Sequence, residues 1–494
     1  MPRARRYQRE RNAMLPVRDL ANQAFSRAAG APLIGGNSVR LLLDAAENYP
    51  AWLDAIKAAE RYVHFESYII HEDREGWKFA DALVAKAREG VRVRLVYDWM
   101  GGLGKTSRSF WKYLRAGGVE VRCYNPPELD SPFGWISRDH RKTLTVDGLV
   151  GFVTGLCVGR MWVGVPEKKI EPWRDTGIEV RGPAVADIEQ AFANVWAVTG
   201  EDLTADEIAK REELEEAGDV TLRVVATEPA SAGMLRTDLL VATLARRRLW
   251  LTDAYYAGTN SYVQALRAAA KDGVDVRLLV PSASDIPLVK PLSRAGYRPL
   301  LEAGVRVFEW NGTMLHAKTA VADCHWARVG STNLNIASWF GNLELDVVIE
   351  DKPFATEMEE TYVQDLENAT EVVLDARHKL RKPTKRESAQ PAATSGGGSG
   401  SRAAAGAIRL GNAVGAAFTN RRVLEPVEAR LMVTAGFFLF GVSLLTWFFP
   451  RVLTYPLIVL MLWISLALFY RAYRLKQNEP VASANPETVE TREL

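Results

Sequence analysis

Two stretches of the chain share one pattern of hydrophobic and polar positions. In 82–95, apolar residues recur at helical spacing up to Gly90 and then alternate with arginines. The stretch 265–278 repeats this order around Gly273. A glycine after a helical pattern marks a helix end, and the following alternation of valine or leucine with charged residues is typical of a strand. The pattern therefore predicts a helix, a glycine stop and a strand in each half.

Further matches extend the repeat. Residues 116–121 correspond to 302–307, and the apolar stretch 63–68 corresponds to 250–255, which places Glu66 opposite Asp253. Strands that alternate with helices indicate α/β halves. We expect a basic N-terminal segment over 1–34, a first half over 35–200, and a second half over 219–375. An acidic connector over 201–218, expected to be helical, joins them.

The C-terminal part has a different pattern. Residues 431–449 and 452–470 are two runs of 19 positions without a charge. Each run would span about 28 Å as a helix, close to the thickness of a bilayer core. Two buried helices of a soluble core are the alternative, but the two-residue connection favours a transmembrane helical hairpin over 429–471. A flexible linker with a possible interfacial segment precedes it over 376–428, and a polar tail follows over 472–494.

Basic residues flank both outer ends of this hairpin: Arg421, Arg422 and Arg430 on one side, and Arg471, Arg474 and Lys476 on the other. The positive-inside rule then predicts that both ends, and with them the preceding α/β halves, lie on the cytoplasmic side. The arginines between Arg3 and Arg11 form either a solvated tail or a contact with anionic lipid or nucleic acid.

Composition narrows the chemistry. The chain has 494 residues with a net charge of +2, so no overall polyanion-binding signature is present. Cys123, Cys157 and Cys324 are scattered without CxxC spacing, which argues against a disulfide framework and a zinc site. We expect no metal and no cofactor.

Each half contains one His-x-Lys-x-x-x-x-Asp sequence. The first holds His140, Lys142 and Asp147, and the second holds His316, Lys318 and Asp323. Because residues two apart on a strand face the same side, each half offers one imidazole and one ammonium to a shared cleft. A single such sequence is weak evidence. Two copies at matching places in an internal repeat make these six residues the candidate catalytic set.

That set suits a phosphodiester. Two lysines stabilise the charge that spreads over the phosphoryl oxygens, one imidazole attacks phosphorus, and the other transfers the proton. Asp175 follows His140 by 35 positions, and Glu344 follows His316 by 28. A carboxylate on the far imidazole nitrogen would fix the tautomer. Ser331 and Asn333 would contact phosphoryl oxygens or a lysine, whereas Glu66 and Asp253 are as readily structural carboxylates as participants.

These residues resemble the phospholipase D superfamily, and specifically its bacterial cardiolipin synthase-like branch. The resemblance covers about residues 35–375, and the segments that carry it are 64–68, 140–142, 173–176, 182–185, 273–277, 284–289, 315–319 and 330–334. It implies duplicated α/β/α halves related by a pseudo-two-fold axis, with one site between them. It also implies phosphatidyl transfer through a phosphohistidine on His140, with His316 as general acid and base. Spacing alone does not distinguish the two histidines.

The sequence departs from the branch at one position of the first half. Thr154-Gly155-Leu156-Cys157 stands in register with Gly330-Ser331-Thr332-Asn333, so a thiol replaces the amide that the branch usually has. In many relatives, moreover, the membrane helices precede the catalytic domain, whereas here they follow it.

The leading functional hypothesis is cardiolipin synthesis, in which a phosphatidyl group moves to the hydroxyl of phosphatidylglycerol at the bacterial inner membrane. A phospholipase D that releases phosphatidic acid is the first alternative. A nuclease of the same superfamily and a membrane scaffold without turnover are the others. We expect phospholipid partners and no nucleic acid, and the sequence does not indicate the oligomeric state.

Overall fold

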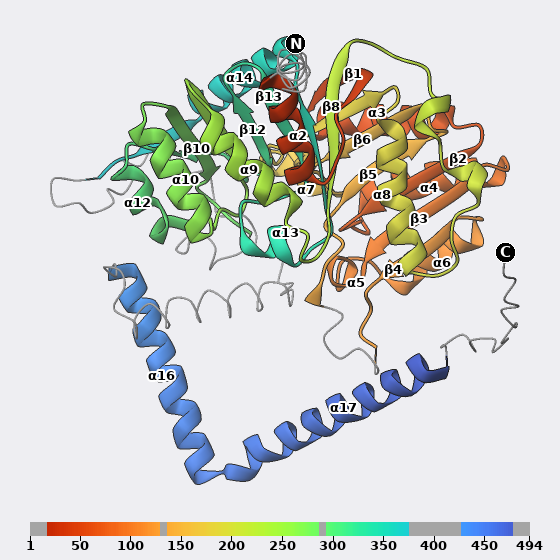
Figure 1. The fold of residues 1–494 in the computed structure, drawn as a ribbon. Helices are drawn as coiled ribbons and strands as arrows, with labels where there is room; N and C mark the ends of the chain where they lie inside the picture. Colours follow the sequence, from red (N-terminus) through yellow and green to blue (C-terminus); the bar gives the residue numbers. More distant parts are fainter. Residues whose placement is uncertain (1–16, 129–135, 286–292, 375–425, 478–494) are drawn as a thin grey trace, which may run out of the picture. The chain divides into compact units, whose positions relative to one another are not determined.

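The structure is a computed structural model that describes residues 17–128, 136–285, 293–374 and 426–477 (Figure 1). These residues form an α/β unit and a C-terminal helical unit. The α/β unit contains a 15-stranded sheet with the order β15-β11-β10-β9-β12-β13-β14-β8-β1-β7-β6-β5-β2-β3-β4. Outward from β8 and β1, which pair at the centre, the second-half order β14-β13-β12-β9-β10-β11 mirrors the first-half order β7-β6-β5-β2-β3-β4. The sheet therefore has the pseudo-two-fold arrangement that the family resemblance implies.

The N-terminal helix and the first half contain the following elements: α2 (Val17–Ala29), β1 (Ile34–Leu43), α3 (Asp44–Ala58), β2 (Tyr62–Ser67), α4 (Arg74–Arg88), β3 (Arg92–Asp98), α5 (Trp99–Gly102), α6 (Arg108–Ala116), β4 (Glu120–Tyr124), β5 (Lys142–Val146), β6 (Val150–Thr154), α7 (Arg160–Val163), η2 (Pro166–Lys168), β7 (Thr176–Arg181) and α8 (Val185–Val198).

The second half contains the matching set: β8 (Val220–Thr227), α9 (Gly233–Leu244), β9 (Arg248–Thr252), α10 (Asn260–Lys271), β10 (Asp275–Pro281), α12 (Tyr297–Leu301), β11 (Arg306–Trp310), β12 (Thr319–Ala322), β13 (Trp326–Gly330), α13 (Ile336–Phe340), β14 (Glu344–Ile349), α14 (Lys352–Glu367) and β15 (Ala369–Val372).

The predicted helix, glycine and strand units are confirmed in both halves. Helix α4 is capped by the Asp73 carboxylate, ends before Gly90 and leads into β3, while α10 is capped by Thr259, ends before Gly273 and leads into β10. Gly90 has a φ of +95° and Gly273 a φ of +91°, a backbone conformation that a side chain disfavours. These two glycines therefore end the helices and direct the chain back into the sheet.

Helices cover both faces of the sheet, which explains why β5 and β12 are buried at every position. In the first half, α3, α4 and α6 share one apolar core with β2, β3 and β5. Helix α8 covers the other face, where Phe192 stacks on His64 of β2. A separate apolar core contains side chains from both halves, among them Val153, Ile178, Leu222 and Leu345. This core joins the two halves into one unit.

The connector over 201–218 is not an α-helix, contrary to expectation. It contains two short turns, η3 (Ala205–Glu207) and η4 (Arg211–Glu213). Its acidic residues bind arginines of β3: Asp206 lies 2.8 Å from Arg92, and Glu207 lies 3.0 Å from Arg94. These ion pairs hold the segment against the sheet, and tertiary contacts thus override its helical composition.

The C-terminal unit contains α16 (Pro426–Phe448) and α17 (Pro450–Gln477). Among the described residues, one helical stretch, Pro450–Tyr470, has the length and apolar character needed to cross a bilayer, with a mean hydropathy of 2.3. Leu439–Phe448 is a shorter apolar stretch. The N-terminal arginines and most of the predicted linker lie outside the described residues.

Candidate active site

Each histidine lies at the start of a strand in its own half: His140 where β5 begins and His316 where β12 begins. His140 precedes β5, whose Lys142 pairs with Ser67 at the end of β2. His316 precedes β12, whose Thr319 pairs with Thr252 at the end of β9. The repeat thus places the same two side chains at the equivalent strand start in each half, and the contacts between the halves bring them together.

Two short parallel bridges connect the halves next to these histidines. Asp139 pairs with Leu343, and Arg174 pairs with Leu315. The next residue in each case donates its backbone N–H across the bridge: His140 to the Leu343 carbonyl at 2.9 Å and His316 to the Arg174 carbonyl at 2.7 Å. Each histidine is therefore fixed to the opposite half by its own main chain.

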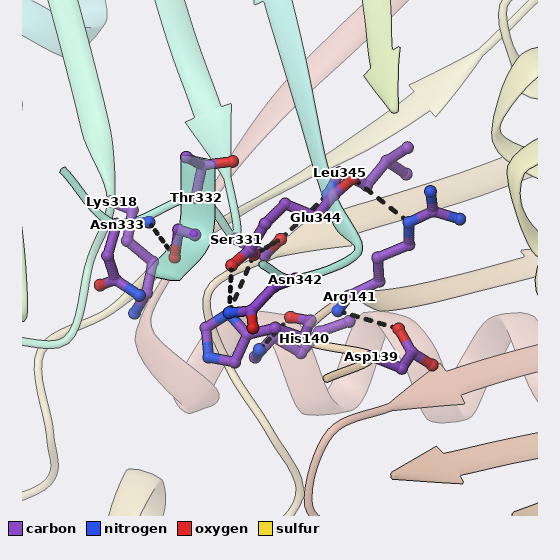
Figure 2. Close-up of polar contacts among 12 residues, drawn as sticks. Asp139, His140, Arg141, Lys318, Ser331, Thr332, Asn333, Asn342, Glu344 and Leu345 are labelled. Atoms are coloured by element: carbon purple, nitrogen blue, oxygen red, sulfur yellow. Dashed lines mark hydrogen bonds and ion pairs between the residues drawn. The ribbon is translucent and has the colours of Figure 1, made fainter. Parts of the chain in front are cut away.

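This register sets the partner of each imidazole. His140 Nδ1 lies 2.9 Å from Glu344 Oε2, and His316 Nδ1 lies 2.6 Å from Asp175 Oδ2. Each carboxylate directly follows the bridge residue of the opposite half, so the pairing is reciprocal. As Figure 2 shows for the first pair, Glu344 also accepts hydrogen bonds from the Ser331 hydroxyl at 2.6 Å and the Asn342 amide at 3.1 Å.

The electrostatics favour neutral imidazoles opposite ionised carboxylates. Burial lowers the pKa of His316 to about 4, with a further contribution from Lys318, and burial likewise lowers the pKa of His140. Burial alone would raise the pKa of Glu344, but His140 and Lys142 hold it below its ordinary value. A neutral imidazole whose Nδ1–H donates to a carboxylate keeps the lone pair on Nε2 for chemistry.

The two lysines complete a single electrostatic environment. Lys142 and Lys318 are 2% and 1% exposed, and burial lowers the pKa of Lys318 to about 8. Lys318 Nζ lies 3.0 Å from His316 Nδ1 and 3.2 Å from Nε2. Lys318 also contributes to lowering the pKa of His140, and Lys142 contributes to lowering that of His316. Each ammonium therefore acts on the imidazole of the other half as well as on its own.

Asp147 and Asp323, which the motif groups with the histidines, lie at the other end of their strands and bind backbone groups there. The Asp147 carboxylate accepts backbone hydrogen bonds from Glu60, Arg61 and Tyr62 at 2.7 to 2.8 Å. The Asp323 carboxylate likewise accepts hydrogen bonds from the backbone N–H groups of 246, 247 and 248 at 2.8 to 2.9 Å. Five residues of extended chain separate Lys142 from Asp147, about 16 Å. The aspartates thus fix the far ends of the strands.

Ser331 and Asn333, two further predicted residues, differ in whether their side chains are already hydrogen-bonded. The Ser331 hydroxyl is committed to Glu344 and accepts the Leu345 N–H, so it holds the carboxylate. Asn333 is 4% exposed, and its Oδ1 has no hydrogen-bond partner in the described part of the chain. It is the better placed of the two to contact a ligand.

Glu66 and Asp253 are both fully buried. Glu66 accepts a hydrogen bond from Thr143 at 2.9 Å, and Asp253 accepts the backbone N–H of Leu334 at 2.8 Å, next to Asn333. Burial raises the pKa of both carboxyls, to about 6 for Asp253. They stabilise the strand and loop that carry the site.

Comparison with known proteins adds to this geometry. A family model described as "Cardiolipin synthase, PLD-like domain" matches residues 52–163 and 241–366. The cardiolipin synthase of Alkalihalophilus pseudofirmus is 33% identical over 345 residues, which cover 69% of this chain and 68% of that protein. The chain belongs to the cardiolipin synthase-like branch of the phospholipase D superfamily.

Two further comparisons agree with this membership. Cardiolipin synthase 2 of Bacillus anthracis is 35% identical over 350 residues, covering 69% of this chain and 67% of that protein. The crystal structure of phosphatidylserine synthase from Haemophilus influenzae Rd KW20 superposes with a TM-score of 0.56 at 14% identity, covering 71% of this chain and 91% of the other. The latter likeness shows that the two chains share a fold.

Proposed function

We propose that the protein is a phosphatidyltransferase that makes cardiolipin from phosphatidylglycerol. The observation that carries this proposal is the reciprocal site, in which His140 and His316 each donate Nδ1–H to a carboxylate of the opposite half beside two buried lysines. A site with two neutral imidazoles and two ammonium groups fits an anionic phosphodiester and covalent transfer. The relatives named cardiolipin synthase supply the substrate class.

In the proposed first step, His140 Nε2 attacks phosphorus and the bond from phosphorus to the leaving headgroup oxygen breaks. His316 takes up a proton from the medium when the anionic phosphodiester binds beside it, and gives that proton to the leaving oxygen. In the second step, the hydroxyl of phosphatidylglycerol gives its proton to His316, and its oxygen attacks phosphorus. The phosphorus–nitrogen bond then breaks, which releases cardiolipin and restores both imidazoles. Lys142 and Lys318 stabilise the phosphoryl oxygens in both transition states.

Exposed apolar side chains around the site support a lipid substrate. Leu103, Ile136, Val163, Ile170 and Phe340 are 40 to 51% exposed. All five lie in connections between strands, on the side of each half where its histidine lies, and two of them end short helices: Val163 ends α7 and Phe340 ends α13. Such side chains suit an edge that meets the acyl region of a bilayer while phosphate enters the site.

The C-terminal unit would supply the membrane attachment. Pro450–Tyr470 is long enough to cross a bilayer, at about 31 Å, and the basic residues on both outer flanks would keep both ends cytoplasmic. We therefore propose a two-helix anchor at the bacterial inner membrane, with the α/β unit on the cytoplasmic side.

Product analysis tests the proposed reaction. The full chain is reconstituted in vesicles of phosphatidylglycerol, and the lipids are measured by mass spectrometry beside a His140→Ala variant. We expect cardiolipin and free glycerol with the wild type and neither with the variant. Phosphatidic acid as the main product would establish a hydrolase instead, and unchanged lipid in both samples would refute phosphatidyl transfer.

A further inference from the structure

The two carboxylates of the site are held by different donors. Glu344 accepts hydrogen bonds from the Ser331 hydroxyl and the Asn342 amide. Asp175 instead accepts a hydrogen bond from the indole N–H of Trp162, whose Nε1 lies 3.0 Å from Asp175 Oδ2. This is the same oxygen that His316 Nδ1 contacts at 2.6 Å. The imidazole and the indole therefore share one carboxylate oxygen.

Gly155 explains why the donor differs. It stands at the position that Ser331 occupies in the other half, and a Cβ atom on Gly155 would lie 2.2 Å from Asp175 Oδ1. A side chain at this position would displace the Asp175 carboxylate from its present place, so a hydroxyl there could not hold Asp175 as Ser331 holds Glu344. Trp162 of α7 comes from seven residues further along the chain and fills the role from another direction. It is 2% exposed and packs against Trp173 and His316 with ring centroids 5.1 and 5.7 Å apart.

We infer that Trp162 is a positioning residue that fixes the Asp175 carboxylate and thereby sets the orientation and proton affinity of His316. When two N–H groups donate to one carboxylate oxygen, each hydrogen bond weakens the other, because each donor withdraws electron density from that oxygen. Without the indole N–H, Oδ2 would attract the Nδ1 proton of His316 more strongly and the imidazole would bind a second proton more readily. The carboxylate would also lose one of its constraints against rotation. The consequence for catalysis rests on the function proposed above, whereas the effect on His316 does not.

Replacing Trp162 with phenylalanine removes the N–H and keeps an aromatic ring. Trp52→Phe is the matched control, because Trp52 lies in the same core and its indole nitrogen has no hydrogen-bond partner among the described residues. Proton affinity is read by NMR titration of the full chain in detergent with isotope-labelled histidine, and a His316→Gln variant assigns the signal. We expect the His316 midpoint to rise by about half to one pH unit in W162F, a three- to tenfold change in proton affinity, and to stay in place in W52F.

Turnover gives the second measurement. With phosphatidylglycerol vesicles, we expect kcat to fall about tenfold in W162F at a KM within about twofold of the wild type, since an imidazole of altered orientation and basicity transfers protons less effectively. W52F, corrected for its folded fraction, should keep the wild-type kcat.

An unchanged His316 midpoint in W162F would overturn the inference, as would equal losses of kcat in W162F and W52F. If the midpoint moves while the wild type transfers no phosphatidyl group, the positioning role stands and the proposed reaction fails. Should W162F not fold, benzothienylalanine incorporated at position 162 replaces the N–H with sulfur in a ring of nearly the same volume. The same two measurements then decide the question.

Discussion

The substitution Asp147→Asn tests whether Asp147 has a catalytic or a structural role. The Asp147 Oδ1 accepts the N–H groups of Arg61 and Tyr62, and Oδ2 accepts that of Glu60. Asparagine keeps one acceptor oxygen but turns an NH2 group toward the Glu60 N–H. Its tolerance of positive φ suits the +56° at this position, so the backbone itself does not oppose the change.

The expected loss follows from these three bonds. A hydrogen bond to a charged group contributes about 1.5–3 kcal/mol and one between neutral groups about 0.5–1.5 kcal/mol. Asp147→Asn removes one charged bond and converts two to neutral ones. Allowing for non-additivity, we expect the free energy of unfolding to fall by about 3 kcal/mol. For a unit of this size the melting temperature should then fall by about 5 °C.

Thermal unfolding and turnover are measured on the same preparations. Per folded molecule, kcat in phosphatidyl transfer should stay within about twofold of the wild type at 25 °C. Asp54→Asn is the control, because Asp54 is exposed and its ion pair with Lys57, 3.5 Å away on the same helix, is a surface contact. A large loss of kcat at an unchanged melting temperature would refute the structural role and return Asp147 to the chemistry.

Three further outcomes are expected. Cys157→Asn, which restores the amide that Asn333 provides in the other half, should lower KM for phospholipid about threefold, and a KM above that of the wild type would argue against a phosphate contact at this position. Burial lowers the pKa of His64 to about 3, so the folded state resists its protonation and stability should fall as pH drops from about 6.5 toward 3. His64→Phe keeps the stacking on Tyr62 and Phe192 and should make that decline in denaturant titrations shallower, whereas an unchanged decline would assign it to other groups. A chain that ends at residue 374 should transfer short-chain phosphatidyl groups in solution but co-sediment with vesicles at least about tenfold less, and full retention of vesicle binding would refute the proposed anchor.

Local patterns predicted much of the fold. The repeat around Gly90 and Gly273 appears in the structure because a helix end and a strand start depend on neighbouring residues. The connector over 201–218 was predicted as helical because its composition suits a helix. Arg92 and Arg94, more than 100 positions away, bind its acidic residues, and no local pattern reports such contacts.

The candidate site shows the same division. His140 and His316 were identified because the motif repeats, but Asp147 and Asp323 were grouped with them because a sequence motif does not show which end of a strand faces the cleft. Spacing likewise indicated Asp175 and Glu344 without indicating which imidazole each would serve. Trp162 and Asn342 were missed, since they occupy non-equivalent positions in the two halves and the repeat therefore gives no signal for them.

The two parallel bridges at Asp139–Leu343 and Arg174–Leu315 pair each histidine with a carboxylate of the opposite half. Neither half alone therefore contains a complete site. A substitution beside Glu344 affects His140 in the other half of the chain, and one beside Asp175 affects His316 in the other half in the same way. Fragments separated at the connector would have to reassemble before either histidine regained its carboxylate. Sequence drift in one copy of the duplication is thereby constrained by the other, even where the two copies no longer resemble each other.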